Sequence, residues 1–95
     1  MVWLVTGLLN AQSSSADNRN FDLALSSKNV DYCVLIKDKD KKIECFGTIK
    51  RNSGYCDMIK DSDLKNKCLS VALSDSTYCN EIKDKKSKEH CLSNK

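Results

Sequence analysis

Apolar and aromatic residues recur along this chain in a pattern with a sequence period of 23. Within one copy, Tyr32, Cys33 and Ile36 fall at i, i+1 and i+4, which is the spacing of one face of a short helix. Seven of fourteen columns are identical in three copies: Tyr32–Cys45 (YCVLIKDKDKKIEC), Tyr55–Cys68 (YCDMIKDSDLKNKC) and Tyr78–Cys91 (YCNEIKDKKSKEHC). Self-similarity at a fixed period is typical of repeat architectures, in which each copy is one supersecondary unit.

The polar positions predict how each copy turns back on itself. Lys37 and Asp38 follow the first helix, where a lysine complements the helix dipole and an aspartate can N-cap the next helix. The second helix repeats the i, i+1, i+4 spacing with Cys45, Phe46 and Ile49. Copies are joined by turn-and-cap sequences such as RNSG at 51–54. Each unit is therefore predicted to be a helix, a tight turn, a helix and a turn.

A half repeat without a cysteine precedes the first full copy. Asn20–Leu25 (NFDLAL) aligns with Cys68–Leu73 (CLSVAL), so that Asn20 takes the cysteine column and Phe21 takes an apolar column. On this alignment the connection to Cys33 is two residues longer than in later copies. We expect this unit to cap the N-terminal end of the array, where repeat proteins carry a modified repeat.

Six cysteines in a chain with few large apolar residues indicate cross-links, because a thin core seldom offsets chain entropy alone. Six cysteines allow about fifteen connectivities. Pairing between hairpins strands Cys33 and Cys91, since the half repeat offers no partner. Antiparallel helices also place the two cysteines of one hairpin opposite each other. The sequence favours pairing within hairpins: Cys33–Cys45, Cys56–Cys68 and Cys79–Cys91.

The predicted fold class is all-α. Tandem antiparallel helical hairpins, each stapled by one disulfide, are expected to form a short α-solenoid-like array of about seven short helices. The absence of proline and the presence of only three glycines favour helices with short connections over a loop-rich scaffold. The predicted organisation is a leader at 1–12, a linker at 13–19 and a repeat domain at 20–95, divided into 20–29, 30–52, 53–75 and 76–95.

The first residues resemble the core of a secretory signal. Val2–Leu9 (VWLVTGLL) is an apolar run too short to span a bilayer as a helix, and Leu9 and Ala11 fit a cleavage site. A typical signal has a lysine or arginine before its apolar run, but none precedes the run here. The alternative is a first helix buried against the repeats.

The motif Y-C-x-x-I-K-D-x-x-x-K-x-x-C, followed by an apolar residue, resembles a tandem cysteine-repeat family of helical hairpins. Its members are predicted exported or membrane-tethered proteins, largely archaeal and bacterial, and the resemblance covers residues 20–95. It implies a fold and a compartment but no defined activity. A weaker, architectural resemblance is to the helical hairpins of the mitochondrial intermembrane space, which carry two disulfides across one hairpin.

Charge and motif spacing exclude several functional classes. Lysines and aspartates are interleaved, with a formal net charge of +3, which indicates a solvated surface rather than a nucleic-acid groove. No two cysteines have the spacing of a zinc knuckle, and His90 is expected to be a surface residue. With no C-x-x-C pair and one histidine, thiol exchange and triad catalysis are not expected. We therefore predict no enzymatic activity, no metal and no cofactor.

Protein interaction remains the leading hypothesis. The three repeated tyrosines could form a contact row, or each could pack over its own disulfide: Tyr32, Tyr55 and Tyr78. The sequence predicts a secreted or extracytoplasmic structural or protein-binding module, with a membrane tether only through an uncleaved leader. Its partner would be another protein or a cell-surface component. The alternatives are a secreted effector or inhibitor acting on a foreign protein and, more distantly, a thiol-redox or metal protein.

Overall fold

The computed structural model describes residues 2–93 of the chain, with side chains from residue 15 onward. Within that part every regular element is helical, which confirms the all-α fold class. Six α-helices and one 3-10 helix follow in order: α1 (Val2–Ser27), α2 (Asp31–Val34), α3 (Lys39–Lys50), α4 (Ser53–Cys56), α5 (Ser62–Ala72), η1 (Ser76–Glu81) and α6 (Lys85–Ser93).

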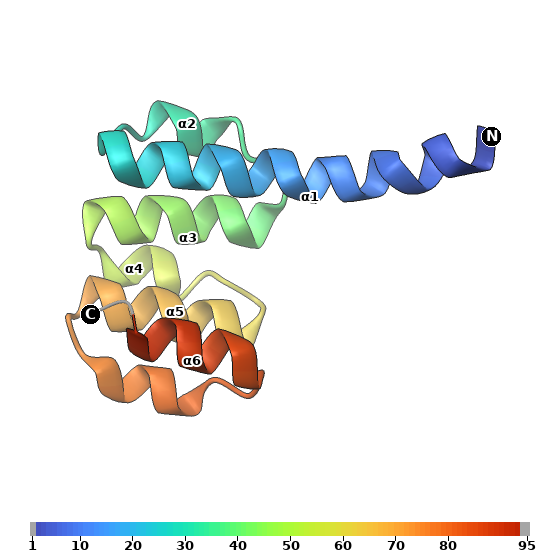
Figure 1. Ribbon diagram of the computed structural model, residues 1–95. Coiled ribbons are helices and arrows are strands. Elements are labelled where there is room, and N and C mark those ends of the chain that lie inside the picture. Colours follow the sequence, from blue (N-terminus) through green and yellow to red (C-terminus); the bar gives the residue numbers. More distant parts are fainter. Residues whose placement is uncertain (1, 94–95) are drawn as a thin grey trace.

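Long and short helices alternate and stack into an elongated array (Figure 1). The helix α3 lies between α1 and α5, and each short helix packs against both the long helix before it and the long helix after it. The array and the projecting part of α1 together measure 47 × 30 × 22 Å. The N-terminal half of α1 extends beyond the other helices, on the right of Figure 1.

The first helix of each hairpin is shorter than the sequence pattern predicts. In the first hairpin, α2 ends at Val34, and Ile36 lies beyond it in the turn. The Ile36 backbone N–H still donates to the Cys33 carbonyl over 3.1 Å, and the Ile36 side chain is buried. Leu35, directly after α2, keeps right-handed helical angles (φ −76°, ψ −14°), so the i, i+1, i+4 spacing does not require a full helix here.

Each long helix that leads into a further hairpin ends in a left-handed residue. Three non-glycine residues, related by the sequence period, take a positive φ: Lys28 at 55°, Arg51 at 50° and Ser74 at 52°. The next backbone N–H in each case donates to a carbonyl five residues back, the bond of a Schellman motif. The residue after each left-handed position, Asn29, Asn52 or Asp75, accepts from the N–H two residues on and so starts the next short helix.

These caps show that the repeat period runs without interruption into α1. Lys28 and Arg51 are separated by one full period, so no two-residue insertion separates the half repeat from the first hairpin. The predicted alignment of Asn20 with the cysteine column is therefore wrong by two positions. Asp22, which is exposed, stands where Cys45 and Cys68 stand in later units.

The predicted linker at 13–19 is also corrected by the structure. Those residues are part of α1, and Asp17 is 6% exposed because it belongs to the array. Residues 1–12, for which the sequence predicts a leader, continue the same helix from Val2. None of the helices between residues 2 and 93 is both long and apolar enough to cross a membrane.

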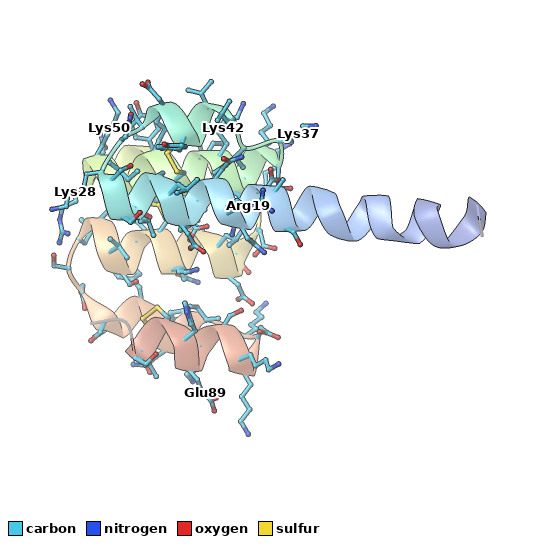
Figure 2. All side chains as sticks on the ribbon, turned by 45° about the horizontal axis from the view of Figure 1, so that its top comes forward. Arg19, Lys28, Lys37, Lys42, Lys50 and Glu89 are labelled. Carbon is cyan, nitrogen blue, oxygen red and sulfur yellow. A yellow bond between two sulfur atoms is a disulfide. The ribbon has the colours of Figure 1, made fainter. Side chains whose placement is uncertain are left out.

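One disulfide joins the two helices of each hairpin. The bonds are Cys33–Cys45, Cys56–Cys68 and Cys79–Cys91, with Cα atoms 5.5 to 5.6 Å apart. All six cysteines are buried, and the yellow sulfur–sulfur bonds lie between the helices in Figure 2. These are the pairs that the sequence favours, and the cysteine-free half repeat still explains them, with Asp22 rather than Asn20 in the empty column.

One aspartate on each of the helices α1, α3 and α5 fastens that helix to the next unit. We call Asp17, Asp40 and Asp63 the junction aspartates. Each accepts two backbone N–H groups, one per carboxylate oxygen, at 2.8 to 3.1 Å. The donors are the paired residues of the following turn: Lys37 and Asp38, Lys60 and Asp61, and Lys83 and Asp84. The start of the following long helix (α3, α5 or α6) is thereby held against the preceding one.

We expect Asp40→Ala to lower the free energy of unfolding by about 2 kcal/mol, because two hydrogen bonds to a charged acceptor are lost. The stability of Asp40→Asn should lie between those of the wild type and Asp40→Ala, since an amide keeps one acceptor and turns an N–H₂ toward the second donor. The matched control is Asp57→Ala, an exposed carboxylate that accepts no hydrogen bond from the described residues. Urea unfolding of the three variants measures the difference. Equal losses at Asp40 and Asp57 would contradict this role.

Candidate binding surface

The three repeated tyrosines are all half-buried. Tyr32 packs against the core of the first hairpin, which contains Cys33 and Cys45. The Tyr55 ring stacks on Phe46 of the preceding unit, with centroids 5.8 Å apart and planes inclined by 23°. Tyr32 therefore lies by its own disulfide, whereas Tyr55 lies across a junction. All three side chains are partly exposed, and a row of tyrosines that contacts a partner stays a prediction.

A second column with the same period places aromatic and charged groups on neighbouring helices. Phe21, Glu44 and Lys67 come from α1, α3 and α5, respectively. The Lys67 ammonium lies 3.6 Å from a Glu44 oxygen and 5.7 Å from the Phe21 ring centroid. The Lys41 ammonium approaches the same ring at 4.7 Å. These cation–π and ionic contacts link the first three long helices.

Glu44 is the most deeply buried carboxyl among the described side chains, at 1% exposed. Burial raises its pKa above the usual value, and the neighbouring Lys67 and Lys41 only partly oppose this. Its Oε1 atom has no hydrogen-bond partner among the described residues. A raised pKa means that the folded state binds a proton more tightly than the unfolded state does. This contribution to stability is thus fully present below about pH 4.5 and is lost as the pH rises through the folded pKa.

We expect Glu44→Gln to unfold less readily than the wild type at pH 7, by on the order of 1 kcal/mol, because an incompletely paired buried charge is removed. The gap should shrink toward pH 4, where Glu44 is increasingly protonated. Asp75 and Asp84 have lowered pKa values and the opposite pH dependence, but both proteins share them, so their effect cancels in the difference. Thermal unfolding at the two pH values measures the gap. A variant that is less stable by the same amount at both would contradict the prediction.

Two adjoining hollows lie between the second and third hairpins. The first, with a volume of about 390 Å³, has an apolar floor of Val71 and the Cys79–Cys91 disulfide, and Arg51 lines it together with several serines. The second, of about 430 Å³, is formed by Lys67, Lys86, Ser87 and His90. Lys67 lines both. We call the two hollows together the α5–α6 groove.

The groove is basic. Four of its lining residues are basic: Arg51, Lys67, Lys86 and His90. Its one carboxylate, Asp75, accepts hydrogen bonds from the Thr77 hydroxyl at 2.7 Å and the Thr77 backbone N–H at 3.0 Å. These bonds lower the pKa of Asp75, so it remains ionised as a helix cap. Glu89 of α6 points away from the other helices (Figure 2).

Other lysines lie outside the groove. Lys28, Lys37, Lys42 and Lys50 point outward from different sides of the first hairpin and its neighbour (Figure 2). No three histidines, cysteines or acidic residues gather as metal ligands in the part of the chain that the structure describes. All six cysteines are in disulfides. His90 is exposed, and its place is the edge of the groove.

Two features of the site have weak signals in the sequence. The junction aspartates Asp17, Asp40 and Asp63 share the repeat period, but no neighbour in the chain indicates their contacts with the next unit. The groove has no motif of its own, because it is lined by residues of different columns.

Comparisons with known protein families, curated proteins and solved structures found no match to this chain.

Proposed function

We propose that this protein is a non-enzymatic, extracytoplasmic repeat module that binds another protein. Three disulfides in a small helical protein are typical of oxidising, extracellular compartments, where such bonds persist. The proposal of a binding role rests mainly on the groove formed across two stacked hairpins.

The array suits binding because its surface is fixed before a partner arrives. Within each hairpin a disulfide holds the two helices, and between hairpins a junction aspartate holds their ends. A preorganised surface loses little conformational entropy on association. Exposed apolar side chains on the short-helix side add contact area: Val34, Leu35 and Met58, between 56% and 59% exposed.

A capture experiment tests the proposal. The oxidised full chain, immobilised through its C-terminus, is incubated with the envelope fraction and culture supernatant of its own host. The control is the same chain reduced and alkylated. We expect a protein that is retained only by the oxidised chain and that, once purified, binds it with saturable 1:1 stoichiometry. Absence of any such protein from both fractions would refute the proposal.

The compartment is tested separately in the native host. Whole cells are treated with a maleimide, without reductant, and the protein is then analysed by mass spectrometry. Unmodified cysteines in the intact chain indicate three disulfides formed in the cell, as expected outside the cytoplasm. Six modified cysteines would place the protein in a reducing compartment.

A further inference from the structure

The junction that forms the α5–α6 groove differs from the one before it. At the second hairpin, partly buried side chains fill the core around the disulfide: Ile43, Leu64, Leu69 and Ala72. Around Cys79–Cys91 only Leu92 does so among the described residues. The helix α5 also contacts α6 less extensively than it contacts α3. The third hairpin therefore leaves an open hollow above its own disulfide.

The charge of two repeat columns also changes at this junction. The column of the junction aspartates continues, one period after Asp63, with Lys86. The column that holds Phe21 and Glu44 continues with Lys67 and His90. All three residues line the groove, so positions that elsewhere hold carboxylates or an aromatic ring hold basic residues here.

We propose that the α5–α6 groove binds an extended acidic segment of a partner protein, with one apolar side chain in the hollow over the Cys79–Cys91 disulfide and carboxylates along Arg51, Lys67 and Lys86. This inference rests on the proposed function and names the chemistry of the partner.

The basic side chains of the groove favour an acidic partner. Arg51 donates one guanidinium N–H to the Ser74 hydroxyl. This bond fixes the Arg51 side chain and leaves its other N–H groups free to bind a carboxylate. Lys67 is paired with buried Glu44 but keeps 26% of its side chain exposed at the point where the two hollows meet. Serine hydroxyls around the first hollow supply neutral hydrogen-bonding groups.

Shape and composition favour a peptide over a nucleic acid. Single-stranded nucleic acids bind where aromatic rings stack on bases, and neither hollow is lined by phenylalanine, tyrosine or tryptophan. The hollow of about 390 Å³ has a mainly apolar floor, which suits a side chain such as leucine better than a phosphate. A peptide that alternates acidic and apolar residues satisfies both parts of the groove.

The test uses a labelled peptide in which glutamate alternates with leucine, and a matched peptide with glutamine in place of glutamate. Binding to the full oxidised chain is followed by fluorescence anisotropy and by ¹⁵N chemical shifts. We expect saturable binding of the glutamate peptide only, with the largest shifts at Arg51, Ser70 and His90, and weaker binding as salt is raised. Equal binding of both peptides, or shifts centred elsewhere, would overturn the proposal.

Two variants with matched controls locate the site. Arg51→Asn and Lys86→Gln each remove one groove charge, and we expect each to weaken binding about three- to tenfold. Lys28→Asn removes a charge from the same left-handed column, and Lys85→Gln removes one beside Lys86, but neither lines the groove. Asparagine tolerates the left-handed conformation, so the fold should persist. Equal losses in variants and controls would mean nonspecific attraction and overturn the site.

Competition by a polyanion and binding of the captured partner test the proposal further. If single-stranded DNA or a heparin oligosaccharide displaces the peptide and binds more tightly, the groove is a polyanion site and the peptide assignment fails. If a partner protein captured from the host binds wild type and Arg51→Asn equally, the groove is not its site, while the protein-binding function stands.

Discussion

Reduction of the three disulfides is expected to unfold this protein at room temperature. Each bond links residues twelve positions apart, and a loop of that size is worth about 3 kcal/mol in the chain-entropy treatment. Three such bonds are comparable to the whole net stability of a small domain, roughly 5–15 kcal/mol. Few other contacts replace them, since six of the eleven buried apolar residues of the described core are the cysteines themselves.

Far-UV circular dichroism with and without a strong reductant measures this effect. We expect the helical signal to fall and the thermal transition to disappear after reduction, and both to return on reoxidation. The short helices α2 and α4, of four residues each, cannot persist without the tertiary contacts that the disulfides hold. Retention of the helical signal and of a cooperative transition in the fully reduced protein would show that the core stabilises the fold on its own.

Single disulfides allow a graded version of the same experiment. Replacing Cys56 and Cys68 by serine should cost more than replacing Cys79 and Cys91, because the second hairpin has neighbours on both sides whereas the third has the weaker junction. The terminal pair is thus the matched control for the central pair. Loss of the same stability from both would mean that each hairpin folds independently of its neighbours.

Local features of the fold follow directly from short stretches of sequence. The Lys-Asp turns, the predicted caps and the disulfide pairs depend on residues within one hairpin. Asp38 caps α3 by accepting from the Lys41 N–H at 2.9 Å, and Asn52 caps α4 by accepting from the Gly54 N–H at 2.8 Å. The role of such residues can be predicted from their neighbours in the chain, and for this reason the hairpins could be predicted.

Features between units could not be derived in the same way. Asp40 is two residues from Asp38 and is equally suited to a cap, but its carboxylate reaches Lys60 and Asp61, 20 and 21 residues away. The predicted alignment of the half repeat is wrong because Phe21 and Ala24 match the apolar columns only in a register that is two residues off, and the left-handed Lys28 fixes the correct one. The groove depends on side chains that the third hairpin lacks, and a pattern search does not detect missing volume.

Close approach between units is clearest at one small-residue column. Ala24, Gly47 and Ser70 occupy the same position in successive repeats, each on a long helix and facing the disulfide of a hairpin. The Ser70 hydroxyl lies 3.4 Å from the Cys91 sulfur. At Gly47, a Cβ atom would lie 2.6 Å from the Cys68 sulfur and 3.2 Å from the Cys56 sulfur. Glycine therefore sets the close packing of α3 on the second hairpin, and serine at the next junction accompanies the looser one.

Gly47→Val should lower the free energy of unfolding by about 3 kcal/mol, because its side chain must displace a disulfide that cannot rotate away. Gly47→Ala should cost less, since a gain of about 0.5–1 kcal/mol in helix propensity offsets part of the clash. Gly54→Ala is the control: it is exposed, and an added Cβ meets only the Asn52 side chain, with its oxygen at 3.0 Å. Denaturant unfolding compares the three variants under oxidising conditions. If alanine at Gly47 stabilised the protein as much as propensity alone predicts, α3 would not be packed against the second disulfide, and the small-residue column would have no part in spacing the hairpins.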